Sequence, residues 1–281
     1  MLTFIKMQGT GNDYVYMDTF QQKIQDPAQL SIRVSDRHFG IGADGLILLS
    51  PEPGADFRMS IYNADGSQAE MCGNGIRCAA KYAYDKGLID KNKTRLEVAT
   101  GAGMRQITLH VENGEVAGVT VDMGAPILEA ENIPVKAQKE GNSVIVREEA
   151  QGQMFELSCV SMGNPHAITF VPEVEHFDVE GYGRILENAA VFPNRSNIEF
   201  VKVLDRSNVQ MRVWERGSGE TMSCGTGACA TAAAAFLKGL TDREVTVHVR
   251  GGELKIQWNE DDGHIYMTGP AVMVFEGTIE E

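Results

Sequence analysis

Several features are scarce in this 281-residue chain. It has only five cysteines, an odd and sparse number that argues against a disulfide framework and predicts free thiols. Its 25 basic residues against 39 acidic ones give a net charge of −14, which argues against binding nucleic acid or anionic membranes. The longest apolar stretch, residues 228–237, is about half of a membrane span. No basic segment followed by an apolar run begins the chain, so no signal peptide and a cytoplasmic location are expected.

Two similar cysteine frames are present instead. Met71-Cys72-Gly73-Asn74-Gly75 and Ser223-Cys224-Gly225-Thr226-Gly227 lie 152 residues apart (224 minus 72), and each precedes an apolar segment that ends in Lys-Gly-Leu. The same offset relates Gly11-Asn12 to Gly163-Asn164 and Tyr62-Asn63 to Trp214-Glu215. A constant offset across several segments predicts two structural repeats that carry one thiol each, with a period far too long for a solenoid.

Each repeat reads as short strands around one apolar helix. Alternating segments such as 106–112 and 115–122, joined by Asn113-Gly114, predict a hairpin. Residues 228–237 are apolar on every face, and 76–84 nearly so, which predicts helices buried all round. We expect a mixed α/β (α+β) fold of two pseudo-symmetric domains, each a mostly antiparallel sheet curled around a central helix, with the active site in the cleft between them. The expected boundaries are 1–122 plus 269–281 for the first domain and 123–268 for the second.

Both cysteines are placed at a predicted helix N-terminus. Unpaired N–H groups and the helix dipole favour the thiolate there, and they also bind carboxylates. Glycine in the first turn lets a ligand approach the backbone. Two such thiols on opposite faces of one α-carbon would remove a proton from one side and return it on the other, which inverts the stereocentre.

The same residues have less specific interpretations. Most free cysteines are core residues, and that role is expected for Cys78, Cys159 and Cys229. A lone histidine such as His166 is more often structural than functional, and a Glu-Arg pair is usually a solvated ion pair. A thiol-based metal or redox module is disfavoured because the cysteine spacings match neither zinc sites nor C-x-x-C motifs. A binding protein without catalysis is disfavoured because both thiol frames are intact.

Taken together, the motifs resemble those of the diaminopimelate epimerases. The resemblance rests on segments spread over most of the chain: Gly9-Thr10-Gly11-Asn12-Asp13, Tyr62-Asn63-Ala64-Asp65-Gly66-Ser67, residues 70–78, Gly163-Asn164-Pro165-His166, Asn197, Glu215-Arg216-Gly217 and residues 223–227. It implies an isomerase that uses no pyridoxal phosphate, other cofactor or metal. Such an enzyme interconverts LL- and meso-diaminopimelate for lysine and peptidoglycan synthesis, acts on this small molecule alone, and is a homodimer by analogy.

The resemblance also assigns roles to individual residues. Cys72 and Cys224 look like the two catalytic acid/base groups, with His166 and Glu215 beside the thiols or the reacting ammonium. The remaining positions are implied to bind substrate. The α-carboxylate would be held by Gly73, Asn74, Gly225 and Thr226, the reacting head by Asn12, and the distal groups by Asn63, Asn164, Asn197 and Arg216, with Glu215 also in contact.

Some features separate this chain from its relatives. Gly45 stands where some family members carry glutamine, so a side-chain contact made there is missing or comes from elsewhere. Proline racemases have His after the first Cys-Gly and Asp before the second Cys, where this chain has Asn74 and Ser223. A phenazine-pathway isomerase of the same fold lacks the thiol pair. A racemase of another amino acid, of histidine or proline type, remains the alternative, although Arg216 and three asparagines suit a distal zwitterion better.

Overall fold

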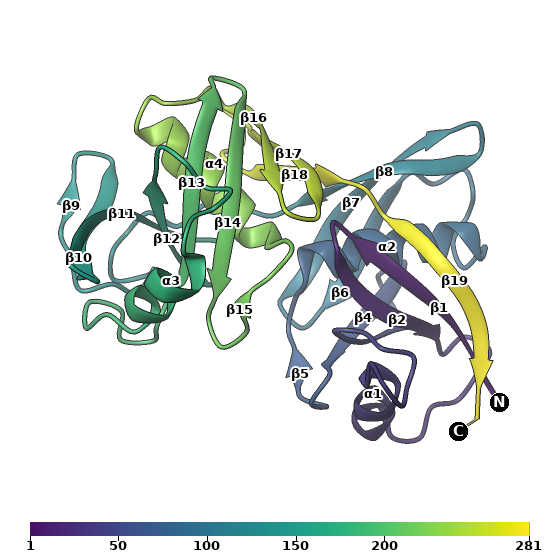
Figure 1. The fold of residues 1–281 in the computed structure, drawn as a ribbon. Coiled ribbons are helices and arrows are strands. Elements are labelled where there is room, and N and C mark those ends of the chain that lie inside the picture. Colours follow the sequence, from purple (N-terminus) through teal and green to yellow (C-terminus); the bar gives the residue numbers. More distant parts are fainter. Residues whose placement is uncertain (281) are drawn as a thin grey trace. The chain divides into compact units, whose positions relative to one another are not determined.

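The computed structural model describes residues 1–280 and divides into two compact units (Figure 1). Unit 1 comprises residues 1–122 and 268–281, and unit 2 comprises residues 123–267. Both are dominated by strands, and the four helices of the described chain fall two to each unit. None of the helices in residues 1–280 is long and apolar enough to cross a membrane. The mixed α/β class expected from the sequence is confirmed.

Unit 1 is built on a curled sheet of mixed strand direction. Its strands lie in the order β19, β1, β2, β3, β4, β6, β7, β8, with the short β5 at the end of β4. The β2–β3 and β4–β6 pairs are parallel and the others are antiparallel. The strands are β1 (Leu2–Gly9), β2 (Asn12–Asp18), β3 (Gly45–Ser50), β4 (Phe57–Asn63), β5 (Gln68–Ala69), β6 (Arg95–Thr100), β7 (Gly103–Glu112), β8 (Glu115–Asp122) and β19 (Val272–Ile279).

The helix α2 (Gly73–Asp85) forms the core of unit 1. It packs against β1, β2, β3, β7 and β8, strands from both ends of the sheet order, so the sheet wraps around it. Every residue from Gly73 to Tyr84 is buried except Lys81, as expected for a helix with almost no polar face. The second helix of the unit, α1 (Pro27–Ser35), lies outside against β3 and β4 and is capped by Asp26.

Unit 2 repeats this arrangement. Its strands lie in the order β9, β10, β11, β12, β13, β14, β16, β17, with the short β15 on β14; β12–β13 and β14–β16 are parallel. They are β9 (Lys139–Glu140), β10 (Ser143–Ala150), β11 (Gln153–Ser161), β12 (Pro165–Phe170), β13 (Asn197–Asp205), β14 (Asn208–Glu215), β15 (Gly219–Glu220), β16 (Glu244–Val249) and β17 (Gly252–Trp258). A further strand, β18 (Ile265–Gly269), runs across the division between the units.

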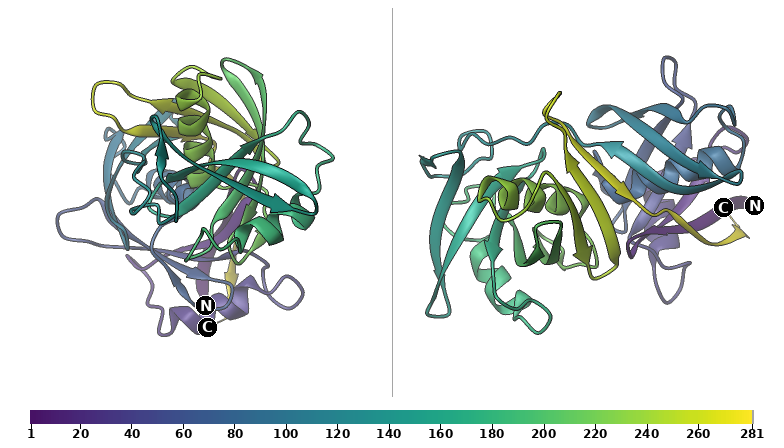
Figure 2. Two further views of the ribbon diagram at one scale, coloured as in Figure 1. Left: turned by 90° about the vertical axis from the view of Figure 1, so that its left-hand side faces the viewer. Right: turned by 90° about the horizontal axis from the view of Figure 1, so that it is seen from above.

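The helix α4 (Gly225–Leu237) is the core of unit 2. It packs against β11, β12, β13, β16 and β17, and all residues from Gly227 to Ala235 are buried. Figure 2 shows α4 lying along the strands of its unit. The outer helix α3 (Val179–Glu187) is capped by Asp178 and covers β10, β13 and β14. The prediction that residues 228–237 are wrapped by other elements is confirmed.

The repeat extends to element boundaries that the motifs alone did not reveal. Helices α1 and α3 are both nine residues long and start 152 residues apart (179 minus 27), and α2 and α4 are both thirteen residues long with the same offset. In unit 1 the successive strand pairs alternate between antiparallel and parallel along the order β1, β2, β3, β4, β6, β7. In unit 2 the pairs show the same alternation along the order β11, β12, β13, β14, β16, β17. Corresponding positions in the two units can therefore be compared residue by residue.

The chain ends in unit 1, next to its start. Leu2 pairs with Ile279 in the antiparallel β1–β19 ladder, and the two termini lie side by side in both views of Figure 2. The buried side chain of Arg77 helps to fix this return. Its Nε donates to the Pro270 carbonyl at 3.1 Å and its Nη1 to the Gly73 carbonyl at 3.3 Å, so α2 and the start of β19 are connected.

Turn residues predicted from the sequence adopt the backbone that their types favour. Asn113 and Gly114 both have positive φ (52° and 82°), as a two-residue hairpin requires, and they join β7 to β8. The buried face of that hairpin places Ile107, Leu109 and Val121 in the core.

Gly45, the position where some relatives carry glutamine, has no room for a side chain. A Cβ there would lie 2.2 Å from the Tyr62 carbonyl oxygen and 2.9 Å from the Tyr14 ring. We predict that Gly45→Ala lowers the free energy of unfolding by about 2 kcal/mol, because backbone must shift to relieve the overlap.

Chemical denaturation followed by circular dichroism would measure this change. Gly118→Ala is the matched control, because its nearest neighbour would be at an ordinary 3.9 Å. Equal stability of the two variants would contradict the account of Gly45.

Candidate active site

In unit 1, Cys72 is the N-cap residue of α2. Its backbone is extended (φ −141°, ψ 112°), and its sulfur accepts a hydrogen bond from the Gly75 N–H at 3.2 Å. Serine, threonine, aspartate or asparagine usually supplies the capping atom. Because an N–H donor and the helix dipole both favour a negative charge, this position stabilises a thiolate on Cys72.

The Cys72 thiol is also held by Asn12. The sulfur lies 3.2 Å from Asn12 Oδ1, and the Asn12 Nδ2 donates to Asp44 Oδ2 at 2.7 Å. A carboxylate accepts but does not donate, so Asp44 fixes the orientation of the amide and turns its oxygen toward the sulfur. Asn12 Oδ1 therefore accepts a hydrogen bond from the S–H group when Cys72 is protonated, while the Gly75 N–H stabilises the thiolate when it is not.

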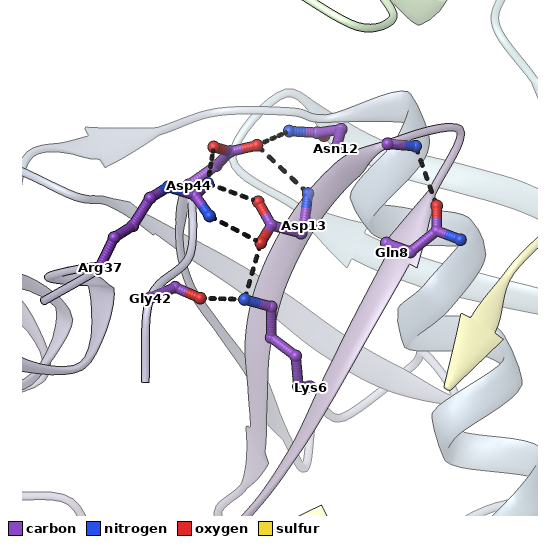
Figure 3. Close-up of polar contacts among 8 residues, drawn as sticks. Lys6, Gln8, Asn12, Asp13, Arg37, Gly42 and Asp44 are labelled. Carbon is purple, nitrogen blue, oxygen red and sulfur yellow. Dashed lines mark hydrogen bonds and ion pairs between the residues drawn. The ribbon is translucent and has the colours of Figure 1, made fainter. Parts of the chain in front are cut away.

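A cluster of charges holds Asp44 in place (Figure 3). Arg37 binds Asp13 at 2.8 Å and Asp44 at 2.9 Å, and Lys6 binds Asp13 at 2.7 Å and also donates to the Gly42 carbonyl. Burial disfavours the charge on Asp13, but the hydrogen bonds from Arg37 and Lys6 outweigh it and lower the pKa of Asp13. The sequence analysis did not anticipate this cluster, because its members are scattered over residues 6–44.

In unit 2, Cys224 occupies the corresponding N-cap of α4 in different surroundings. It is only 5% exposed, and its sulfur makes no well-formed cap hydrogen bond to the helix within residues 1–280, although the Gly227 N–H and the Thr226 hydroxyl are near enough to lower the pKa of the thiol slightly. Thr226 Oγ1 lies 3.5 Å from the sulfur. Burial raises the pKa of Cys224 well above its usual value, and the charges of Glu215 and Glu199 raise it further. The surroundings of Cys224 therefore favour the protonated thiol.

Glu215 lies at the end of β14, next to Cys224. Burial raises the pKa of Glu215, although hydrogen bonds from Thr221, at 2.5 Å, and from Cys224 act in the opposite direction. The pseudo-equivalent residue of unit 1 is Asn63 (215 minus 152), whose side-chain amide donates to Ser67 Oγ at 3.0 Å. The structure thus brings Glu215 and Cys224 together, as the resemblance implied.

His166 is fully buried on β12 and is in contact with a residue that sequence reasoning missed. Its Nδ1 lies 2.6 Å from Glu199 Oε1, and its Nε2 lies 3.1 Å from Asn164 Oδ1. The sequence does contain one indication that Glu199 is unusual, because this carboxylate stands within the otherwise apolar segment Ile198-Glu199-Phe200-Val201. Its significance depends on the parallel β12–β13 pairing, which the sequence did not specify.

His166, Glu199 and Cys224 could in principle hold a metal ion. Their donor atoms lie within 4.8 Å of one another, and imidazole, carboxylate and thiolate all bind zinc. However, His166 Nδ1 and Glu199 Oε1 already share a 2.6 Å hydrogen bond, which a metal would have to displace. The geometry fits a hydrogen-bonded cluster better than a metal centre.

The other expected substrate-binding residues lie in the same two neighbourhoods. In unit 1, Asn74 is buried in the first turn of α2, with its Oδ1 3.4 Å from Thr10 Oγ1. In unit 2, the Asn197 amide joins two strand ends, because its Nδ2 donates to the Pro165 carbonyl at 3.0 Å and its Oδ1 accepts from Arg216 N at 2.8 Å. The Arg216 guanidinium donates to the Asn194 carbonyl at 2.8 Å.

Comparison with known proteins decides the family. A sequence model of diaminopimelate epimerase matches residues 4–129 and 158–274. The chain belongs to the diaminopimelate epimerase family. It is 54% identical to the diaminopimelate epimerase of Agathobacter rectalis and 53% identical to that of Methanococcus maripaludis strain C5, over 99% of this chain and at least 99% of each relative. This epimerase is accordingly an isomerase.

Solved structures of lower similarity show the same fold. The probable proline racemase of Agrobacterium radiobacter K84 superposes with a TM-score of 0.72 at 15% identity, covering 100% of this epimerase and 93% of that chain. At this identity the likeness concerns the fold alone.

The surroundings of the two thiols predict unequal reactivity. Alkylation requires a thiolate, so at pH 8 we expect iodoacetamide to modify Cys72 on the order of tenfold or more faster than Cys224. Burial raises the pKa of Cys78 to about 11 and that of Cys159 to about 12, so both should remain unmodified and serve as internal controls.

Peptide mass spectrometry over a time course would give the separate rates. The Cys224 rate should rise more steeply than that of Cys72 as the pH increases above 8. Equal rates, or faster modification of Cys224, would contradict the assignment of Cys224 as the protonated thiol.

Proposed function

We propose that this protein is a cofactor-independent epimerase that interconverts LL- and meso-2,6-diaminopimelate by proton transfer between Cys72 and Cys224. The observation that carries the proposal is the duplication of one unusual arrangement, a cysteine at the N-cap position of a buried helix whose first turn is Gly-X-Gly. Relatives of this chain at 54% and 53% identity bear the name diaminopimelate epimerase, which supports the choice of substrate.

The difficult step is the removal of a weakly acidic α-proton. Without a cofactor to delocalise the developing negative charge, fixed dipoles near the α-carbon must stabilise it. We propose that the first-turn amides of α2 (Gly73, Asn74) and α4 (Gly225, Thr226) bind the α-carboxylate, because helix N-termini attract anions. Asn12 lies beside Cys72 and would contact the reacting amino acid head.

The two thiols would divide the acid and base roles. Cys72, with an N–H donor on its sulfur, is suited to act as the thiolate base, and Cys224, beside Glu215, is suited to deliver a proton. In one direction of the reaction, the Cys72 thiolate takes the α-proton from one face of the α-carbon, and the Cys224 thiol protonates the carbanion from the other face. In the reverse direction the roles exchange, since both directions share one transition state.

The distal half of the substrate carries a carboxylate and an ammonium, so its binding site needs both a cationic side chain and hydrogen-bond acceptors. We propose that Arg216 binds the distal carboxylate and that Asn63, Asn164 and Asn197 bind the distal ammonium and carboxylate. Asn197 also holds the backbone of Arg216 in position through the 2.8 Å hydrogen bond to its N–H. A product made in this way would serve lysine and peptidoglycan synthesis, in a reducing cytoplasm that keeps the five cysteines as free thiols.

Single substitutions test the catalytic assignment. We predict that Cys72→Ala and Cys224→Ala each reduce epimerisation by on the order of 10³-fold or more, because each removes one partner of the proton transfer. Proton NMR of LL- and meso-diaminopimelate would measure the turnover.

Cys229→Ala is the matched control, because this thiol is buried on α4 five residues beyond Cys224. It should retain turnover once its lower stability is allowed for. A Cys72 or Cys224 variant with near-normal activity would remove that residue from the mechanism.

We also propose that the epimerase is a homodimer. Four consecutive apolar residues of β19 are exposed: Val272 (42%), Met273 (50%), Val274 (56%) and Phe275 (46%). An exposed apolar run on a strand is a common site of association. A second copy of this chain is the simplest partner to cover it.

Light scattering at micromolar concentration tests this proposal. We predict a dimer for the wild type and a monomer for Val274→Lys, because the new charge would be buried in the interface. Phe39→Lys is the control, since Phe39 is 94% exposed but isolated from this run. A monomeric wild type, or a dimeric Val274→Lys variant, would contradict the proposal.

A further inference from the structure

The two units differ at one buried position that lies against the first turn of the central helix. In unit 1, a Cβ added to Gly75 would lie 2.7 Å from Ile47 Cδ1, and in unit 2 a Cβ added to Gly227 would lie 2.6 Å from Glu199 Oε1. Both glycines and both neighbours are related by the same offset, since 227 minus 75 and 199 minus 47 are each 152. A carboxylate in unit 2 therefore replaces an aliphatic side chain in unit 1.

Burying this carboxylate has a cost that its contacts must offset. Glu199 is fully buried, and moving a carboxylate out of water costs several kcal/mol unless it is paired. Its Oε1 is paired with His166 Nδ1 at 2.6 Å, but its Oε2 is buried without a hydrogen-bond partner in residues 1–280. Isoleucine serves at the equivalent place in unit 1, so packing alone does not require the charge.

We propose that Glu199 is a positioning residue of the Cys224 half-site, which fixes the tautomer of His166 and keeps Cys224 protonated until substrate binds. The inference rests on the proposed function and deepens it, because it names the group that makes the two duplicated thiols unequal. Glu199 itself touches neither the reacting carbon nor substrate in this account.

The hydrogen bonds define what Glu199 does to the imidazole. A carboxylate can only accept, so Nδ1 must carry a proton that it donates to Glu199 Oε1. The opposite nitrogen, Nε2, then faces Asn164, whose amide can present its oxygen or, turned over, its NH₂ group. Glu199 thus fixes one ring nitrogen and leaves the other to respond to Asn164 and to the substrate.

The negative charge acts directly on the thiol as well. Glu199 on β13 and Glu215 on β14 both disfavour a second anion on Cys224, and His166 on β12 belongs to the same cluster. Cys159 on β11 also lies close enough to feel the charge of Glu199, and burial raises the pKa of Cys159 to about 12, so it stays neutral. Removing the Glu199 charge should therefore make Cys224 easier to ionise.

Two measurements that need no substrate test the inference. In wild-type protein, ¹⁵N NMR of the histidine side chains, with His166→Gln to assign the signal, should show a proton on Nδ1. In Glu199→Gln, alkylation of Cys224 at pH 8 should be on the order of tenfold faster than in the wild type, because one neighbouring negative charge is gone.

Steady-state kinetics distinguish a positioning role of Glu199 from a merely structural one. For Glu199→Gln we expect kcat to fall on the order of 10- to 100-fold with KM changed by less than about threefold, because the hydrogen bond from His166 Nδ1 would then go to a neutral amide oxygen instead of a charged carboxylate. Thr231→Val is the control, because Thr231 is a buried polar residue of α4 whose hydroxyl donates to Met211 Sδ at 3.2 Å, away from the Glu199–His166 pair. It should leave both the alkylation rate and kcat unchanged.

The outcomes separate this inference from the proposed function. If the wild type does not epimerise diaminopimelate, the proposed function fails, while the NMR and alkylation results still decide the role of Glu199. An unprotonated Nδ1, or Cys224 reactivity and kcat unchanged in Glu199→Gln, would overturn the inference. Stoichiometric zinc in purified protein would overturn it too, because a metal would occupy the atoms that form the hydrogen bond.

Discussion

The structure depends on one constraint. In each unit a helix is buried on all sides, while the N-terminus of that helix carries a candidate catalytic cysteine. A sheet must wrap around such a helix, and in both units the wrapping strands fix the position of the first turn. Glycine at the third helical position, Gly75 or Gly227, lets β3 or β13 approach closely. The thiol at the N-cap is therefore held by the core of its unit rather than by a mobile loop.

The duplication places a cysteine at a helix N-cap in both units, but the side chains around the sulfur differ between the two copies. Strand pairing, helix lengths and first-turn glycines are the same, whereas Tyr14, Ile47 and Asn63 correspond to His166, Glu199 and Glu215. The scaffold was preserved and the electrostatic surroundings were not. The Asn12 amide beside Cys72 is held by Asp44, while Cys224 lies beside the fully buried Glu199 and the half-buried Glu215, and this difference suits the unequal protonation that the proposed mechanism requires.

Sequence patterns predicted the parts of the fold that depend on local chemistry. The apolar run 228–237, the Asn113-Gly114 turn and the repeated frames were sufficient to predict two buried helices, a hairpin and the fold class. The roles of the two thiols, inferred from the duplicated cysteine frames and assigned in detail by the resemblance, remain proposals. Arg77 is a charged residue within the nearly apolar segment 76–84, yet it is fully buried, because backbone carbonyls of Gly73 and Pro270 accept its hydrogen bonds. Glu199 and the Asp13–Arg37–Asp44 cluster were missed, since their partners are brought together only by strand pairing.

The most direct test of the central claim is proton NMR of the purified, reduced epimerase with LL-diaminopimelate in D₂O and no added cofactor. Two thiols acting on opposite faces predict that the α-proton signal disappears while meso-diaminopimelate appears with deuterium at the inverted carbon. An isomer that keeps the original proton, or no exchange and no isomer with both thiols reduced, would contradict the account.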